Sequence, residues 1–252
     1  MSYLEFKREC ISRIQAQGAD IGLAAATKAW FALANSHGYS YHFESFGRPL
    51  IQYPQDVVQL QELISTILPD LVLETGIAHG GSLVLYASML CLLDVMEGRD
   101  PRQSPRKVVG VDIDIRPHNR QALDEHPLRF KMELIEGSSI DTDIIQQVRR
   151  YAEGVERVLV ALDSNHTHEH VLAELNAYAD LVSVGSYCIV FDTVIEDLPA
   201  GSFPDRPWDL GNNPKTAVHE WLRSHPEFEI DNDIDNKLLI SVAPNGYLRR
   251  VA

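Results

Sequence analysis

The chain has 252 residues, of which 45% are hydrophobic and 23% are charged. These proportions are typical of a folded globular protein and exclude a disordered chain, and the length suffices for one large α/β domain or two small ones. Acidic residues outnumber basic ones by 36 to 22, so the formal net charge is −14. This charge argues against binding to nucleic acid or to an anionic membrane, because both need a basic surface.

The N-terminal sequence shows no export signal. MSYLEFKREC mixes charges from its fifth residue and lacks a basic segment followed by an apolar one. The longest mostly apolar run, Leu83 to Leu93, is about half of the roughly 20 residues that cross a bilayer. The three cysteines lie far apart and predict neither a disulfide framework nor a zinc ribbon. We therefore expect a cytoplasmic protein with no transmembrane segment.

Residues 1–53 are predicted to form a helical N-terminal extension. The stretch from Gly22 to Asn35 is rich in alanine, and His37-Gly38-Tyr39 interrupts it. Aromatic residues crowd the loop that follows. Two interpretations stay open, a helical cap packed on a core and a lid that faces the substrate.

From residue 54 onward, helical and strand patterns alternate. Pro54 opens a segment with apolar residues at helical spacing. Seven strands are predicted, at 71–73, 108–111, 134–135, 158–162, 187–191, 237–242 and 247–251. The last two are separated by Pro244-Asn245-Gly246, whose turn chemistry suits a hairpin. The pattern predicts an α/β fold with a doubly wound, mainly parallel seven-stranded sheet and a C-terminal antiparallel hairpin, in one domain over 54–252.

A glycine-rich turn follows the first predicted strand. It reads Glu74-Thr75-Gly76-Ile77-Ala78-His79-Gly80-Gly81-Ser82. At the carboxyl end of a strand, glycines let the backbone approach a ligand, and the next helix offers N–H groups to a carboxylate or phosphate. The spacing is G-x-x-x-G-G, unlike the G-x-G-x-x-G of dinucleotide sites. This spacing suits a turn that binds a ligand with its own ammonium and carboxylate groups. It also suits a turn that is needed only for packing.

Polar residues also end the next two strands. Asp112, with Asp114 as the alternative, stands where a carboxylate normally holds a ribose diol. Ser138 and Ser139 follow the third strand and suit contact with an adenine edge. Each residue alone could belong to an ordinary turn. In this order on successive strand ends, they describe a nucleoside site for S-adenosylmethionine.

Two aspartates end the fourth and fifth strands. One strand–helix–strand unit separates Asp163 from Asp192, so we expect them side by side at one edge of the sheet. Their oxygens suit Mg²⁺ or a similar divalent cation, which could hold a vicinal diol and lower the pKa of the hydroxyl to be methylated. His166 is within reach to accept the hydroxyl proton. Either aspartate could instead cap a helix.

The histidines at 166, 168 and 170 also raise the question of zinc. Their order lacks the H-E-x-x-H spacing, because Leu172 occupies the position that a second histidine would need. We therefore expect His168 and His170 to be solvated helix residues.

Five strings of this sequence resemble the cephalosporin hydroxylase / rhamnosyl O-methyltransferase family: LVLETGIAHGGS, VVGVDIDI, IEGSSID, LDSNHTHEHVLAEL and GYLRRV. The resemblance covers roughly residues 45–252. It implies a Rossmann-like class I methyltransferase fold, bound S-adenosylmethionine, a divalent metal and frequent oligomers. Many members look like sugar O-methyltransferases of polysaccharide or glycolipid gene sets.

The resemblance also bears on the metal ligands. Related metal-dependent enzymes place ligands at the fourth strand end and as an adjacent pair at the fifth, and Asp163 and Asp192 match this pattern. The pair is incomplete here, because Phe191 precedes Asp192 and Thr193 follows it. The third ligand could be Thr193, an acid such as Glu196, or water. The D-x-x-H spacing up to His166 is similar to the metal-plus-base arrangement of macrolide-sugar methyltransferases and supports a base at this position.

The sequence thus favours a metal-dependent O-methyltransferase that acts on a sugar hydroxyl of a small-molecule or glycan acceptor, in a homo-oligomer. The residues expected around the methionine end of the cofactor are Glu74, Gly76, His79, Gly80, Gly81 and Ser82. The loop 201–214, with Arg206, Trp208 and Asn213, is expected to line the acceptor together with the N-terminal aromatic residues. Two alternatives remain, a hydroxylase-type tailoring protein and a catalytically inactive S-adenosylmethionine binder.

Overall fold

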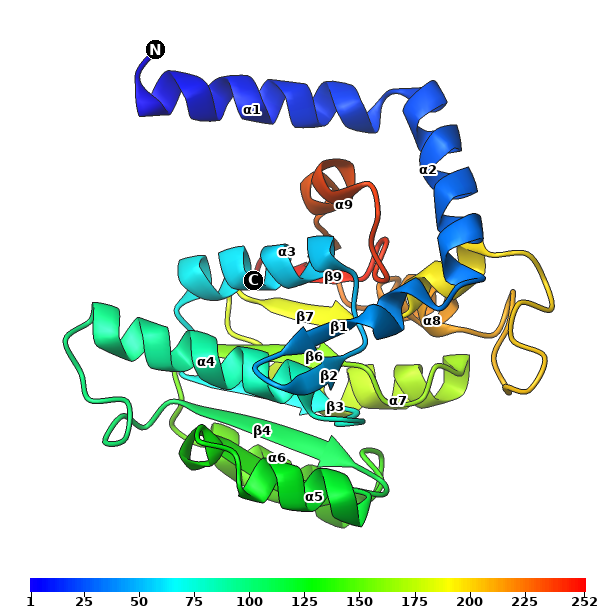
Figure 1. Cartoon of the computed structure of the whole chain (residues 1–252). Coiled ribbons are helices and arrows are strands. Elements are labelled where there is room, and N and C mark those ends of the chain that lie inside the picture. The colour runs from blue at the N-terminus through cyan, green and yellow to red at the C-terminus, as the bar shows by residue number, and fades with distance from the viewer.

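A single seven-stranded sheet forms the centre of the protein. The computed structural model describes all 252 residues. The strands of this sheet are β3 (Leu71–Thr75), β4 (Lys107–Asp112), β5 (Met132–Glu136), β6 (Val158–Leu162), β7 (Tyr187–Val190), β8 (Phe228–Ile230) and β9 (Tyr247–Arg250). Their order is β5-β4-β3-β6-β7-β9-β8, and Figure 1 shows β4, β3, β6, β7 and β9 in succession from bottom to top. Strands β3 to β7 are parallel, and β9 runs antiparallel to both β7 and β8. The predicted doubly wound α/β fold is confirmed.

Helices cover both faces of this sheet. One apolar core of 30 buried residues contains side chains of α3 (Pro54–Ile67), α4 (Gly81–Met96) and α5 (Pro117–Asp124). A second core of 21 contains side chains of α6 (Thr142–Ala152), α7 (His168–Tyr178) and α8 (Pro214–Trp221). Along β6, Leu159 and Ala161 belong to the first core, whereas Val158, Val160 and Leu162 belong to the second. Such a strand, buried on both faces, explains why its sequence is continuously apolar.

Short 3₁₀ turns connect several of these elements. They are η1 (Tyr39–His42), η2 (Arg129–Lys131), η3 (Ala179–Leu181) and η4 (Thr193–Asp197). None of the helices combines the length and the apolar character that a membrane crossing requires.

The N-terminal extension consists of α1 (Tyr3–Gly18), α2 (Ile21–Asn35) and a small hairpin of β1 (Phe43–Ser45) and β2 (Arg48–Leu50). Helix α1 lies along the top of the molecule in Figure 1 and buries none of its residues. Its end is attached to the helix α9 (Asn232–Leu238), where the Gln17 amide donates to the carbonyls of Asn236 and Lys237. The division of the chain at residue 53 remains an interpretation.

The predicted strand over residues 237–242 is wrong. The acidic residues before it form a helix start: the Asp231 carboxylate accepts from the Asp233 N–H, and α9 follows. The Val242 N–H donates to Asp56 and not to a strand. In place of the predicted strand, β8 pairs with β9 at the edge of the sheet; it has three residues and is too short to show a period in the sequence.

Candidate active site

The predicted site residues lie along one edge of the sheet, at the carboxyl ends of its parallel strands. Backbone hydrogen bonds hold these ends together beyond the strands. The Gly76 N–H donates to the Val111 carbonyl at 2.7 Å, and the Asp163 N–H donates to the Thr75 carbonyl at 2.9 Å. Asp163 follows β6, and Asp192 follows β7, which lies beside β6 in the sheet. The topology therefore brings together residues that are far apart in the sequence.

The glycine-rich turn packs against the N-terminal hairpin. Gly76 and Gly80 have φ angles of +90° and +81°, a region that favours glycine. A Cβ on Gly81 would lie 2.2 Å from the Pro49 carbonyl oxygen. The half-buried His79 is fixed through its carbonyl, which accepts from Arg48 Nε at 2.8 Å. Close packing accounts for the glycine at 81, and ligand binding by the turn stays a prediction.

Glu74 lies beneath this turn and is fully buried. Its Oε2 accepts from the Ser82 hydroxyl at 2.7 Å, whereas its Oε1 has no partner. Burial raises the pKa of Glu74 to about 8, against the opposing effect of the Ser82 hydrogen bond. Glu74 and Ser82, both expected around the methionine end of the cofactor, are thus in contact with each other.

Asp112 and the two serines also lie at this edge. Asp112 Oδ2 accepts from the N–H groups of Ile77 and Ala78 at 2.8 and 3.0 Å, so it ties β4 to the glycine turn. Ser138 is half-buried. Ser139 is buried, and its hydroxyl donates to Glu174 at 2.6 Å. The Ser139 hydroxyl is therefore engaged within the protein.

The sequence did not reveal Glu174 as part of this network. This fully buried residue of α7 also accepts from the Ser164 hydroxyl at 2.6 Å, and it forms an ion-pair contact of 3.4 Å with His170. The prediction of solvated histidines is wrong. His170 is turned inward to Glu174, and His168 contacts Thr216 at 2.8 Å. The four-residue spacing of His170 and Glu174 on one helix was the available signal.

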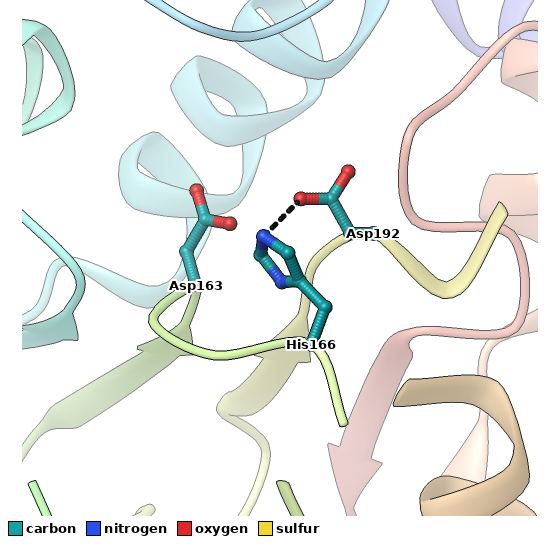
Figure 2. A group of neighbouring side chains, drawn as sticks. All are labelled: Asp163, His166 and Asp192. Atoms are coloured by element: carbon teal, nitrogen blue, oxygen red, sulfur yellow. Dashed lines mark ion pairs between the residues drawn. The ribbon is translucent and has the colours of Figure 1, made fainter. Parts of the chain in front are cut away.

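Asp163, His166 and Asp192 form a cluster (Figure 2). One ligand atom from each lies within 4.8 Å of the others, and all three residues are half-buried. Figure 2 shows the imidazole beside both carboxylates, with Nε2 3.1 Å from Asp192 Oδ2. His168 and His170 are not part of the cluster. The predicted approach of the two aspartates and of His166 is therefore present.

The cluster is acidic and is not neutralised by the chain. Neither aspartate pairs with a lysine or an arginine, and the ionic partner of Asp192 is His166. Burial, followed by the negative charge of Asp192, raises the pKa of Asp163 well above its usual range. Asp192 adopts a φ of +55°, which is uncommon for a residue with a side chain and often marks a functional position. Two such carboxylates beside an imidazole suit a divalent cation.

Thr193 is not brought into this cluster. It is fully buried, and its hydroxyl donates to the Pro244 carbonyl at 2.7 Å. Glu196 is also engaged elsewhere, since its Oε2 accepts from the Gly211 N–H at 2.8 Å. Thr193 and Glu196 are thus both engaged outside the cluster, and its third member is His166.

The loop that carries Arg206 and Trp208 contacts His166. The Trp208 ring meets the imidazole edge to face, with centroids 4.7 Å apart. The Arg206 guanidinium lies 5.3 Å from the centre of the Trp208 ring. Of the residues expected to line the acceptor, Trp208 thus contacts His166 and Arg206 contacts Trp208, whereas Asn213 is fully buried.

A sheet of this order, with a glycine-rich turn after its first parallel strand and acids after the others, defines a class I S-adenosylmethionine-dependent methyltransferase. Residues 37–251 match the family model named Rhamnosyl O-methyltransferase/CmcI, and the chain belongs to this family. The protein is therefore an S-adenosylmethionine-dependent O-methyltransferase.

Curated relatives and solved structures agree with this assignment. The chain is 32% identical over 197 residues to the rhamnosyl O-methyltransferase of Mycobacterium tuberculosis, which covers 77% of this chain and 73% of that protein. The rhamnosyl O-methyltransferase of Mycobacterium leprae is 30% identical, with 77% of both chains covered. A CmcI structure described as Mg-SAM has a TM-score of 0.56 at 18% identity, covering 84% of this chain and 78% of that one. At that identity, the structural likeness concerns the fold.

Proposed function

We propose that this enzyme transfers a methyl group from S-adenosylmethionine to a sugar hydroxyl, with the help of a divalent cation such as Mg²⁺. The observation that carries the proposal is the cluster of Asp163, His166 and Asp192 beside the glycine-rich turn. The rhamnosyl O-methyltransferases among the relatives support a sugar acceptor, and they make rhamnosyl glycosides the first acceptors to test.

The cofactor would lie along the carboxyl edge of the sheet. The turn formed by Gly76, His79, Gly80, Gly81 and Ser82 would hold its methionine end, with Glu74 beneath. Asp112, half-buried at the end of β4, would hold the ribose, and Ser138 and Ser139, which follow β5, would contact the adenine. The glycine conformations fit a ligand that approaches the backbone, and the buried Glu74 carboxyl would lie near its ammonium group.

Asp163 and Asp192 would hold the cation. Their fit rests on two half-buried carboxylates with no basic partner, which a positive charge would stabilise. When bound, the cation supplies positive charge that lowers the pKa of the acceptor hydroxyl. Water and acceptor oxygens would complete its shell, because the Thr193 hydroxyl is committed to Pro244.

His166 would accept the proton of that hydroxyl. Its Nε2 lies 3.1 Å from Asp192 Oδ2, so Asp192 would orient the ring. The new O–C bond forms as the S–C bond of the sulfonium breaks, and S-adenosylhomocysteine leaves. Because no covalent intermediate with the protein is needed, positioning and charge control are the main contributions of the chain.

The decisive experiment measures S-adenosylhomocysteine release with a panel of rhamnosyl glycosides, nucleotide sugars and other glycosides, with Mg²⁺ or with EDTA. We expect turnover on a sugar acceptor that EDTA abolishes and Mg²⁺ restores. Turnover unaffected by EDTA would exclude the metal role. Cofactor binding without methyl transfer to any acceptor would favour an inactive binder.

The homo-oligomeric state and the cytoplasmic location are part of the same proposal. Light scattering coupled to size-exclusion chromatography tests the first, and a monomer at micromolar concentration would contradict it. Fractionation of cells of the source organism tests the second.

A further inference from the structure

Gln52 is a buried residue of the N-terminal extension that contacts the acidic cluster. It lies between β2 and α3 and is 2% exposed. Its amide nitrogen is 3.2 Å from Asp163 Oδ2, to which it donates across 111 positions of the sequence. Its amide oxygen Oε1 is buried and has no hydrogen-bond partner in the protein. An unpaired buried acceptor is costly, so its presence at a candidate site calls for a functional reason.

The segment that carries Gln52 is held firmly on both sides. Arg48 donates from Nε to the His79 carbonyl and from its terminal nitrogen to Asn119 Oδ1, at 2.8 and 2.7 Å. On the other side, Tyr53 is 1% exposed and stacks on Tyr39 with ring centroids 5.3 Å apart. Gln52 is therefore fixed relative to the glycine-rich turn, and it presents its amide to Asp163 in a defined position.

A neutral amide suits this place better than a charged group would. A lysine or arginine at residue 52 would neutralise Asp163 and compete with a cation for it. The amide N–H instead orients one carboxylate oxygen and leaves the negative charge in place. Residues that hydrogen-bond a metal ligand commonly set its orientation, and removing them typically weakens metal binding about 10–100-fold.

We propose that Gln52 is a positioning residue of the metal site, contributed by the N-terminal extension. Its amide nitrogen fixes Asp163 Oδ2, which leaves Oδ1 directed to the cation. Its amide oxygen accepts from an N–H or O–H donor that the loaded site supplies, either the ammonium group of the cofactor or a water of the cation's shell. This inference rests on the metal site of the proposed function.

The test compares Gln52→Met with Gln59→Met. Methionine has nearly the volume of glutamine but cannot donate or accept strongly, so a role in packing alone would survive the change. Gln59 is a matched control: it is also buried, at 4% exposure, and it accepts from Lys237 Nζ at 2.7 Å, outside the cluster. Free Mn²⁺ is measured by electron paramagnetic resonance during titration, and S-adenosylhomocysteine binding is measured by calorimetry.

We expect Gln52→Met to raise the Kd for Mn²⁺ by about tenfold, while Gln59→Met leaves it within twofold of wild type. If the Kd for S-adenosylhomocysteine, measured without metal, also rises in Gln52→Met, Oε1 is assigned to the cofactor ammonium. If that Kd is unchanged, Oε1 is assigned to a water of the cation's shell. If Gln52→Met does not fold, Gln52→Ala, which leaves room for water, is titrated in its place.

A Kd for Mn²⁺ within twofold of wild type in a folded Gln52 variant would overturn the positioning role. Wild-type protein that binds no Mn²⁺ would instead contradict the metal site of the proposed function. The two failures are therefore distinguishable.

Discussion

Gly76 and Asp163 are in direct backbone contact. A Cβ placed on Gly76 would lie 2.0 Å from the carbonyl oxygen of Asp163, and the φ of Gly76 is +90°. The turn proposed to hold the cofactor and the loop that carries the first candidate metal ligand therefore abut with no side chain between them. This contact explains why a glycine stands first in the turn, and it brings the two halves of the site together.

Gly76→Ala should be severely destabilising, because the new methyl group meets a backbone atom that cannot rotate away. We expect a loss of about 3 kcal/mol or more of unfolding free energy, and a strongly weakened affinity for S-adenosylhomocysteine. Gly154→Ala is the control, since Gly154 has a φ of +72° but open space around it. It should cost about 1 kcal/mol. Urea unfolding measures both, and equal losses would contradict the contact argument.

Asp163→Ala should remove metal-dependent turnover while cofactor affinity falls only modestly. The reason is that the carboxylate is proposed to bind the cation, whereas the glycine-rich turn holds the cofactor. We expect kcat/KM to fall at least about 100-fold. The measurement is the initial rate over a range of Mg²⁺ concentrations. Asp233→Ala, at an exposed position of α9, serves as the control. Wild-type turnover in the Asp163 variant would remove the metal mechanism.

His166→Ala separates the role of a base from the role of a ligand. If His166 accepts the proton, kcat should fall by about 10²–10⁴-fold, with the Kd for Mn²⁺ close to wild type. Loss of Mn²⁺ binding in this variant would show that the imidazole is the third ligand. Full activity would exclude both roles. Rapid-quench kinetics and Mn²⁺ titration provide the two measurements.

Glu74 should make the stability of the ligand-free protein depend on pH. Its pKa is about 8 in the folded state, above the value of an exposed glutamate, because it is buried. The folded state then holds this proton more tightly than the unfolded state does. Stability is fully present below about pH 4.3 and is lost progressively as the pH rises through about 8, by an amount on the order of a few kcal/mol.

Thermal unfolding from pH 5 to pH 9 measures this effect of Glu74. Glu74→Gln should flatten the decline in Tm, because the amide has no proton to lose over this range. Identical slopes for the variant and the wild type would show that Glu74 does not titrate in this way.

Trp208→Ala tests whether Trp208 lines the acceptor-binding site. The indole lies against His166, so a sugar presented to the imidazole should contact it. We expect the KM for the acceptor to rise about tenfold, equivalent to about 1.4 kcal/mol, with a smaller change in kcat. Trp208→Phe should recover most of the affinity. An acceptor KM unchanged in Trp208→Ala would place the acceptor elsewhere.

The sequence by itself determined the sheet and the order of the polar strand ends. Strand β6 and the turn after β3 are each formed by consecutive residues, so the sequence pattern alone predicts them. The parallel topology then places Asp163 near Asp192. Local patterns were insufficient at the C-terminus. There, three residues form β8, and an acidic segment starts a helix where a strand was expected.

Only the tertiary structure decided which way individual side chains point. Thr193 follows Asp192 directly in the sequence, yet its hydroxyl is used by Pro244, 51 positions away. Gln52 contacts Asp163 across an even longer separation, and His170 turns inward because Glu174 and two serine hydroxyls meet there. Orientation and long-range contact arise from the packing of elements against one another, which residue spacing along the chain does not record.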